Sequence, residues 1–400
     1  MMETTTVRNI SVKHDHLKIH SVAINGMDLG EMIRSGFNSI QIHLPITRPD
    51  QANVILPEQY AQIFDTIFSG VDELYRSDRG CLAGFLSTFL FDSMTPFWME
   101  LLKNGRHILA VELWKKVLSL AYEWERRTGV HVHKGSPYAF TAYTYLMMGN
   151  IDTGFGYIYN AVEEDRRLND VCPEIGYPKN APVYLTATLN PCRQNVMYSL
   201  VSEIRSVLED HLDFYRREFG SSLSMDHLDR RFLQNPDLEV IVYFFVFTFW
   251  TIFEHQRKVG HDLMQNDFSK LKNANWLFAL CLVIDKLFHS HRQYSDRFIG
   301  SEIVKYVVHK RLMTKDDLND LRDQTKVQEA NLDHLIPKLL SLSVLYNGAP
   351  VRKEIQYLFV AWNLRNFAGH NIEIQNVVAS SFEDIVRVLV YDIFLIIEEY

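Results

Sequence analysis

The sequence contains few cysteines, and none of them has the paired spacing of a zinc-binding motif. The four cysteines are scattered over 400 residues, and no two of them form a C-x-x-C pair. This distribution favours neither a zinc ribbon nor a disulfide framework. It fits a reducing compartment, and we expect a cytoplasmic protein. The four are Cys81, Cys172, Cys192 and Cys281.

Glycine-rich phosphate loops are also absent from the sequence. It contains no G-x-G-x-x-G fingerprint, no P-loop and no G-x-S-x-G nucleophile elbow, so nucleotide binding through a phosphate-cradling loop has no support. Three H-x-H pairs could bind a metal if they lay on strands, but no cysteine or second carboxylate cluster accompanies them. We therefore expect no metal site and no cofactor. The pairs, interpreted as exposed histidines at the ends of elements, are His14-Asp15-His16, His131-Val132-His133 and His289-Ser290-His291.

No apolar run is long enough for a typical membrane span. The most apolar stretch, Val240 to Phe253, has about 14 residues, whereas a transmembrane helix needs about 20. We predict that it is a buried helix and expect no membrane association. The amino-terminal residues lack the apolar centre of a secretory signal. The net charge is −8, so any contact with RNA must come from a local basic patch.

The remaining composition, 47% hydrophobic and 22% charged, is that of an ordinary globular protein. At about 100–200 residues per domain, the length predicts two to four domains. Alternating β-branched and polar residues at 19–24 and 39–44 predict strands, and from Pro57 onward the pattern is helical. We predict a mainly α fold that begins with a small, strand-containing, mixed α/β region at 1–84.

Residues 85–170 contain two stretches that resemble tetratricopeptide repeats. The second stretch matches the order of large and small residues along such a repeat, and the first matches only its later half. The resemblance implies helical hairpins in which small residues let paired helices approach closely. Ordinary hairpins without repeat ancestry are the alternative. The matching residues are Gly105, Ala110, Trp114 and Val117, then Tyr138, Ala142, Tyr145, Gly149, Gly154, Ile158 and Ala161.

Two signals divide the rest of the chain. Residues 171–192 contain four prolines, which is typical of a long loop, so we interpret 171–234 as a linker followed by a helix. Asn235-Pro236-Asp237 supplies a helix N-cap and a first-turn proline, and we place the last domain, a helical bundle, at 235–400. Its final helix opens with Ser381-x-x-Asp384, the pattern of a capping box. The predicted helices are 236–259, 271–289, 301–313, 328–346, 351–368 and 382–398.

Arg365 lies in a predicted helix whose other residues are almost all apolar. Apolar residues recur at steps of three and four from Val351 to Trp362, and the next step reaches Arg365. A buried guanidinium without a partner would cost several kcal/mol, so it needs an anion, a hydrogen-bonding network or a water-filled cleft. Gly369 could take the left-handed conformation that ends a helix, and Arg365 and His370 would then face one cavity.

The segment Arg365-Asn366-Phe367-Ala368-Gly369-His370 resembles the motif of the HEPN superfamily of helical nucleotide-binding and ribonuclease domains. That motif is an arginine, commonly followed by a polar residue such as asparagine, and then a histidine four to six residues after the arginine. The resemblance covers residues 235–400. Two other arginine–histidine pairs have similar spacing, but Arg8 lies in a strand-like terminus and Arg126 in a charged helix end. Solvation is the simpler explanation for both.

The resemblance implies an endoribonuclease that cleaves RNA with the RNA's own 2′-hydroxyl, leaves a 2′,3′-cyclic phosphate and needs no metal. His370 would be the acid or base, Arg365 would neutralise charge on the phosphorane, and Asn366 would orient the arginine or the phosphate. Nucleases of this family generally bring two motifs together across a dimer interface. A homodimer is therefore expected, with RNA as the substrate.

The regions before 235 would then sense a signal, such as a protein or small-molecule activator, or hold the enzyme inactive. Such domain pairing is frequent in microbial defence and toxin systems. A competing hypothesis is a non-catalytic helical-repeat adaptor whose HEPN-like domain mediates dimerisation or nucleotide binding. In that case Arg365 would belong to a structural hydrogen-bonding network.

Overall fold

The computed structural model of the chain describes most residues after position 100 and part of those before it. Within these residues the protein is mainly α-helical with a small strand-containing N-terminal region, as the sequence predicts. The chain divides into two compact units, residues 1–184 and 185–400. The described residues are 3–7, 10–14, 19–24, 26–28, 91, 94–95, 98–99, 101–171, 182–193, 195–258, 267–324, 332–370 and 376–400.

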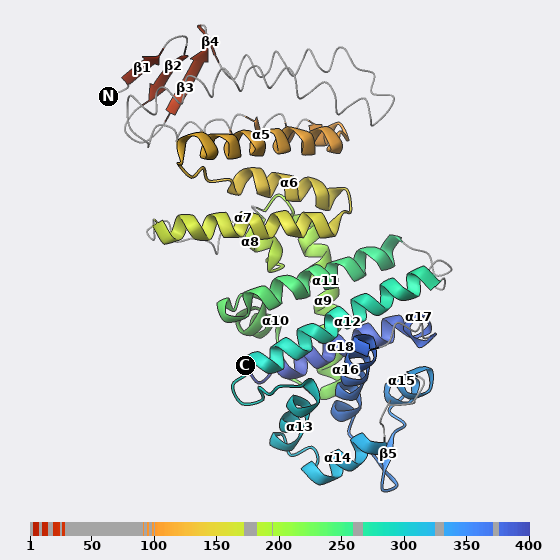
Figure 1. Cartoon of the computed structure of the whole chain (residues 1–400). Coiled ribbons are helices and arrows are strands. Elements are labelled where there is room, and N and C mark those ends of the chain that lie inside the picture. The colour runs from red at the N-terminus through yellow and green to blue at the C-terminus, as the bar shows by residue number, and fades with distance from the viewer. Residues whose placement is uncertain are drawn as a thin grey trace. The chain divides into compact units, whose positions relative to one another are not determined.

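The first unit begins with an antiparallel sheet (Figure 1). The strands, in their order across the sheet, are β1 (Glu3–Val7), β2 (Ile10–His14), β3 (Ile19–Ile24) and β4 (Met27–Asp28). Gly26, at a φ of 78°, makes the tight turn from β3 to β4. The strand predicted at 19–24 is confirmed as β3. The strand predicted at 39–44 lies outside the described residues.

Three consecutive helices follow in the first unit, α5 (His107–Thr128), α6 (Gly135–Met147) and α7 (Ile151–Val171), and each packs against the next (Figure 1). The chain turns from α6 to α7 at Gly149, whose φ of 72° favours glycine. A Cβ added to Gly154 would lie 2.7 Å from the Leu146 side chain, so this glycine permits the close helix contact. Helical hairpins are therefore confirmed here, and their repeat ancestry stays a prediction.

The second unit is a helical bundle with one short β-hairpin. α9 packs against the last helix of the chain, so the region that the sequence suggested to be a linker followed by a helix contributes to this bundle. The elements, the first of which spans the boundary between the units, are α8 (Pro182–Ala187), α9 (Tyr198–Phe219), α10 (Met225–Leu228), η2 (Asp229–Leu233), η3 (Pro236–Leu238), α11 (Glu239–Lys258), α12 (Asp267–Ser290), α13 (Ile299–His309), α14 (Lys315–Gln324), α15 (Leu332–Leu340), β5 (Leu345–Tyr346), β6 (Ala349–Pro350), α16 (Lys353–His370), α17 (Val377–Ser380) and α18 (Phe382–Ile397).

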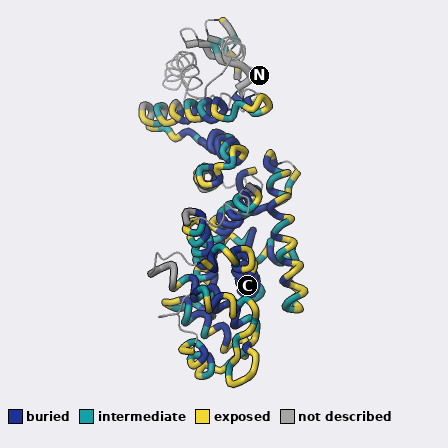
Figure 2. The backbone as a smooth tube through the Cα atoms, turned by 90° about the vertical axis from the view of Figure 1, so that its right-hand side faces the viewer, coloured by how far each residue is buried: buried dark blue, intermediate teal, exposed yellow. Residues whose placement is uncertain are grey.

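The core of the second unit lies around α18. Nearly every α18 residue from Ile385 to Ile397 is buried, and the helix packs against α9, α12 and α16 (Figure 2). The predicted helix at 382–398 is confirmed, but its capping box is wrong. Ser381 directly follows α17 and has a φ of −123° and a ψ of 21°, which is not the extended conformation of a cap, and its side chain makes no capping bond.

Two other stretches of the second unit differ from the prediction. The helix predicted at 328–346 is wrong beyond α15, where β5 and β6 form a hairpin instead. Asn347 and Gly348 have φ values of 51° and 79°, so the Asn-Gly pair makes a tight turn that favours paired strands over helix. α14 was not predicted, because its sequence is largely polar and buries only Leu318 and Leu321.

The apolar helix α11 begins as predicted, with the Asn235 side chain accepting a hydrogen bond of 3.0 Å from the backbone N–H of Asp237. Among the described residues, 236–257 is the one helical stretch long and apolar enough to span a membrane, and half of its most apolar 18-residue window is buried. Trp250 is fully buried, whereas Val240 and Phe244 are exposed. The prediction of a buried helix is therefore correct for one face of α11 only.

Candidate functional site

Arg365 lies on α16, a helix enclosed by its own unit. α16 packs against α12, α13, α15 and α18, which explains why its residues are apolar on most sides. Packing within its own unit therefore accounts for the apolar character of α16, without a second copy of the chain. Arg365 itself is only half-buried, with 31% of its side chain exposed, and the next residue, Asn366, is exposed. Water and a ligand can therefore reach this part of α16.

The end of α16 differs from the prediction. The helix continues through Gly369 to His370, so Gly369 does not end it in a left-handed conformation. On a regular helix, positions 365 and 370 lie about 140° apart around the axis, whereas positions 366 and 370 share one face. Asn366 and His370, rather than Arg365 and His370, therefore share a helix face. The side chain of His370 lies outside the described part of the chain.

Two residues of α12 hold the Arg365 guanidinium. Its Nε lies 3.7 Å from Asp285 Oδ2, and its Cζ lies 5.2 Å from the centre of the Phe278 ring. Phe278 and Asp285 are seven residues apart, or about two helical turns, so they lie on one face of α12. The Arg365 Nε makes no hydrogen bond of normal geometry. Within the described residues, the guanidinium is thus held by one loose ion pair and one aromatic ring.

A second pair of titratable residues lies next to Asp285. His289 is one turn further along α12, and its Nδ1 lies 3.5 Å from Glu302 Oε1 of α13 and 3.2 Å from the Asp296 carbonyl oxygen. The Glu302 side chain is 1% exposed, and its Oε2 has no hydrogen-bond partner. Burial raises the pKa of the Glu302 carboxyl, and the negative charge of Asp285 raises it further. A hydrogen bond from the Asp296 N–H lowers this pKa, but the net shift is upward.

We call Phe278, Asp285, His289, Glu302 and Arg365 the Arg365 cluster. A further acid lies deeper in the same bundle: Asp392 of α18 is fully buried, and neither carboxyl oxygen has a partner. Burial raises the Asp392 pKa well above its usual range. Burial also raises the pKa of the Cys281 thiol, so this buried cysteine is not an activated nucleophile.

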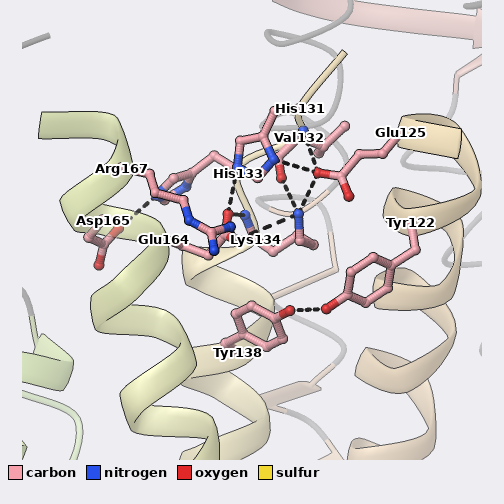
Figure 3. A network of polar contacts seen from close by, with 10 residues as sticks. All are labelled: Tyr122, Glu125, His131, Val132, His133, Lys134, Tyr138, Glu164, Asp165 and Arg167. Carbon is pink, nitrogen blue, oxygen red and sulfur yellow. Dashed lines mark hydrogen bonds and ion pairs between the residues drawn. The ribbon is translucent and has the colours of Figure 1, made fainter. Parts of the chain in front are cut away.

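The first unit contains a different polar cluster, between α5, the loop before α6, and α7 (Figure 3). The Lys134 side chain is 2% exposed, and its Nζ lies 2.5 Å from Glu125 Oε1 and 3.7 Å from Glu164 Oε1. His131 Nδ1 lies 2.7 Å from Glu125 Oε1, and His131 Nε2 lies 2.9 Å from Glu164 Oε2. Both contacts are hydrogen bonds only when the imidazole carries two protons. We call these four residues the Lys134 network.

The surroundings of the Lys134 network extend the same pattern. The backbone N–H of Val132 donates to Glu125, and that of Lys134 donates to Glu164. His133 Nε2 lies 2.7 Å from Asp165 Oδ1. His131 is exposed at the end of an element, as expected, and His133 is half-buried, but both also contact carboxylates of α5 and α7, which the sequence did not predict. No metal-binding group of three or more His, Cys, Asp or Glu occurs among the described residues.

The competing arginine of the first unit is solvated, as expected. The side chain of Arg126 is 70% exposed and pairs with Glu123 on the same helix at 2.7 Å. The predicted pair His289 and His291 lies at the end of α12, where His289 is exposed but His291 stacks on Tyr294. The two histidines therefore have different surroundings and do not form a common site.

A cavity of about 600 Å³ lies elsewhere in the second unit, and Arg365 does not line it. Its charged residues are largely bound already. Lys310 pairs with Glu399 at 2.6 Å, Arg352 pairs with Glu354 at 3.1 Å, and Arg231 donates to the Glu398 carbonyl at 2.8 Å. This arrangement leaves little uncompensated charge to select a ligand.

Sequence reasoning located Arg365 and Asn366 but missed the residues around them. Asp285 and His289 are on α12, about eighty positions earlier, and no local pattern connects them to α16. A usable signal was present: Phe278, Asp285 and His289 recur at helical spacing, with an acid in an otherwise apolar stretch. No protein-family model, curated protein or solved structure matches this chain.

Proposed function

We propose that the chain is a cytoplasmic, metal-independent endoribonuclease that cuts RNA and leaves a 2′,3′-cyclic phosphate. The observation that carries the proposal is the state of Arg365. Its guanidinium is half-buried, held at Nε by a loose contact of 3.7 Å to Asp285, and free of hydrogen bonds from its terminal nitrogens to other described residues. An arginine held this way can bind the oxygens of a phosphodiester with its two terminal nitrogens.

Each residue of the motif has a role in this proposal. Arg365 neutralises the charge that develops on the phosphorane, because its guanidinium is a positive group already positioned by Asp285 and Phe278. Asn366 is exposed beside it and orients the phosphate. His370, at the end of the same helix, acts as acid or base and moves a proton near neutral pH.

The proposal includes a homodimer. Because positions 365 and 370 diverge around α16, a second copy of the chain offers one way to bring an arginine and a histidine to the same phosphate. The first unit, with its helical hairpins, would receive a protein or small-molecule activator or hold the nuclease inactive, as in a microbial defence or toxin system. No membrane takes part in this mechanism.

RNA cleavage in chelator-treated buffer tests the proposal. We expect wild type to cut RNA and His370→Ala to lose at least about a hundredfold in rate, the usual contribution of a proton-transfer group. His334→Ala, which removes an exposed histidine of α15, is the matched control and should keep full activity. Thermal melting checks that His370→Ala and His334→Ala are folded like wild type. Equal cleavage by wild type and His370→Ala would contradict the proposal.

One observation favours the competing adaptor. Asp285 lies close enough to Arg365 to neutralise part of its charge, as in a structural ion pair. In an adaptor, the bundle would serve dimerisation or nucleotide binding, and the chain would leave RNA intact. Dimerisation without any cleavage by wild type would therefore support the adaptor over the nuclease.

A further inference from the structure

We propose that His289 is an acid–base residue of the Arg365 cluster. The inference rests on the proposed nuclease function and adds a histidine that lies outside the segment from Arg365 to His370. His289 is in the last turn of α12, and its side chain is 61% exposed. It lies one turn beyond Asp285, the residue that contacts the Arg365 guanidinium.

The contacts of the His289 ring define which nitrogen can react. Nδ1 lies 3.2 Å from the carbonyl oxygen of Asp296. A carbonyl oxygen only accepts hydrogen bonds, so this geometry assigns a proton to Nδ1. In the neutral ring Nε2 is then an acceptor, and it has no hydrogen bond to a described residue. His289 is therefore oriented to take a proton from a ligand through Nε2.

Glu302 provides the second, independent observation. Its side chain is 1% exposed, its Oε1 accepts a hydrogen bond of 3.1 Å from the Asp296 N–H, and its Oε2 has no partner. Leaving a buried carboxyl oxygen without a partner costs stability, so its retention beside His289 needs an explanation. Glu302 Oε1 lies 3.5 Å from His289 Nδ1, so Glu302 and Asp296 together fix the ring from one side.

The position of His289 relative to Arg365 follows from α12. Residues 285 and 289 are neighbours on one helix face, with about 6 Å between their Cβ atoms. Arg365 Nε lies 3.7 Å from Asp285 Oδ2, so His289 lies about one helical turn along α12 from the residue that contacts the guanidinium. Phe278 belongs to the same half-exposed face of α12, and its ring lies against the Arg365 guanidinium, so it helps to hold that group at this surface. We therefore assign a single-stranded RNA phosphodiester to this surface.

The proposed step moves one proton to His289. Nε2 takes the proton of the RNA 2′-hydroxyl while the 2′-oxygen forms a bond to phosphorus. The bond from phosphorus to the 5′-oxygen then breaks, and this leaving oxygen takes a proton from His370 of the second copy of the chain in the proposed homodimer. The products are a 2′,3′-cyclic phosphate and a free 5′-hydroxyl, with His289 protonated and His370 neutral until solvent restores both.

The test is the pH–rate profile of RNA cleavage by the full chain in chelator-treated buffer. Glutamine at 289 keeps a side chain that can donate to Asp296 but cannot titrate, so we compare His289→Gln with wild type and His370→Ala. His309→Gln is the matched control, because His309 is also an exposed histidine in the last turn of its helix. The charged groups around His289 that shape the profile are Asp285 and Lys286 of α12, Asp296 between α12 and α13, Glu302 and Lys305 of α13, and Arg365 of α16.

We expect His289→Gln to lose about a hundredfold in rate and one limb of the pH profile, and His309→Gln to match wild type. If His289→Gln keeps the wild-type rate and pH–rate profile while His370→Ala is inactive, this inference is overturned and the nuclease proposal stands. Absence of cleavage by wild type would overturn both. A second measurement uses wild type only, so that a folding defect of a variant cannot affect it. In an NMR titration, we add an oligodeoxyribonucleotide, which lacks the 2′-hydroxyl and cannot be cleaved. We expect it to shift the ring nitrogen signals of His289 and not those of His309. Unchanged His289 signals in the presence of bound oligonucleotide would also overturn the inference.

Discussion

The Lys134 network and the Arg365 cluster bury similar groups but satisfy them to different degrees. In the Lys134 network, Glu125 Oε1 receives contacts from the Lys134 ammonium, the Val132 N–H and the His131 ring. In the Arg365 cluster, by contrast, the Arg365 Nε and one Glu302 oxygen have no hydrogen bond. The fold thus pairs the central carboxylate oxygen of the Lys134 network several times, whereas it leaves two buried polar atoms of the Arg365 cluster unpaired.

This difference indicates what each cluster does. The Lys134 network ties the loop before α6 to α5 and α7 (Figure 3), so we expect its charges to stabilise the hairpins. The Arg365 cluster spans α12, α13 and α16, whose packing is already provided by apolar residues such as Leu280, Ile284 and Leu358. The fold does not depend on its polar residues for this packing, and in the proposed nuclease these residues bind RNA and move protons.

Removing the central charge of the Lys134 network should produce the largest change in stability. Lys134→Met leaves Glu125 and Glu164 facing each other in a partly buried space, and breaking a buried ion pair costs about 3–5 kcal/mol. We expect the free energy of unfolding of the first unit to fall by that amount in urea titrations. Lys115→Met is the control, because Lys115 pairs with Glu112 at the surface, and it should change stability by less than about 1 kcal/mol. If Lys134→Met and Lys115→Met lower the free energy of unfolding equally, the Lys134 network stabilises the fold no more than a surface ion pair does. The proposed difference in role between the two clusters would then be lost.

Substitution of Asp285 should change activity rather than stability. Asp285→Asn removes the charge that holds the Arg365 Nε at 3.7 Å, and a misplaced catalytic group of this kind can cost up to about a hundredfold in rate. Both side chains are partly exposed, so we expect the melting temperature to change little. RNA cleavage and thermal melting of the same preparation measure the two effects.

Asp384→Asn is the matched control for Asp285→Asn. Asp384 pairs with Arg387 on the surface of α18 at 2.7 Å, which is a closer contact than that of Asp285 with Arg365. The control variant should keep wild-type cleavage. If Asp285→Asn lowers the melting temperature strongly and leaves cleavage unchanged, the Arg365 cluster is structural and the adaptor gains support.

Much of the fold was predictable because it depends on local spacing. The apolar residues of α18 recur at helical steps, so the sequence predicted this helix nearly to its ends. The Gly149 turn and the small residue at Gly154 likewise predicted the hairpin of α6 and α7. In these elements, the apolar and small residues that define the local spacing are the same residues that pack in the folded structure.

The candidate site was less predictable because it depends on contacts between distant residues. A glycine near a helix end favours a left-handed stop, yet α16 continues through Gly369, since a glycine inside a helix costs only about 1 kcal/mol and packing can offset it. The carboxylates that bind His131 come from α5 and α7, and the acid beside Arg365 comes from α12. Spacing along one helix carries no information about such partners.

Acid titration should reveal a smaller effect, specific to the Lys134 network. Burial alone would raise the pKa of Glu125, but hydrogen bonds from Lys134 and from the Val132 N–H, with the charges of Lys134 and His131, bring it below the usual value of 4.5. A carboxyl whose pKa is lower in the folded state stabilises the fold above its unfolded pKa, and this contribution is lost as the pH falls through the folded pKa. We therefore expect the melting temperature of wild type to fall below about pH 4.5 more steeply than that of Glu125→Gln, which has no carboxyl to protonate. Glu123→Gln, at the exposed pair with Arg126, should instead keep the steep wild-type dependence. If the melting temperatures of Glu125→Gln and wild type fall in parallel as the pH is lowered, the charge of Glu125 does not stabilise the first unit. The contrast between the paired charges of the Lys134 network and the unpaired groups of the Arg365 cluster would then have no effect on stability.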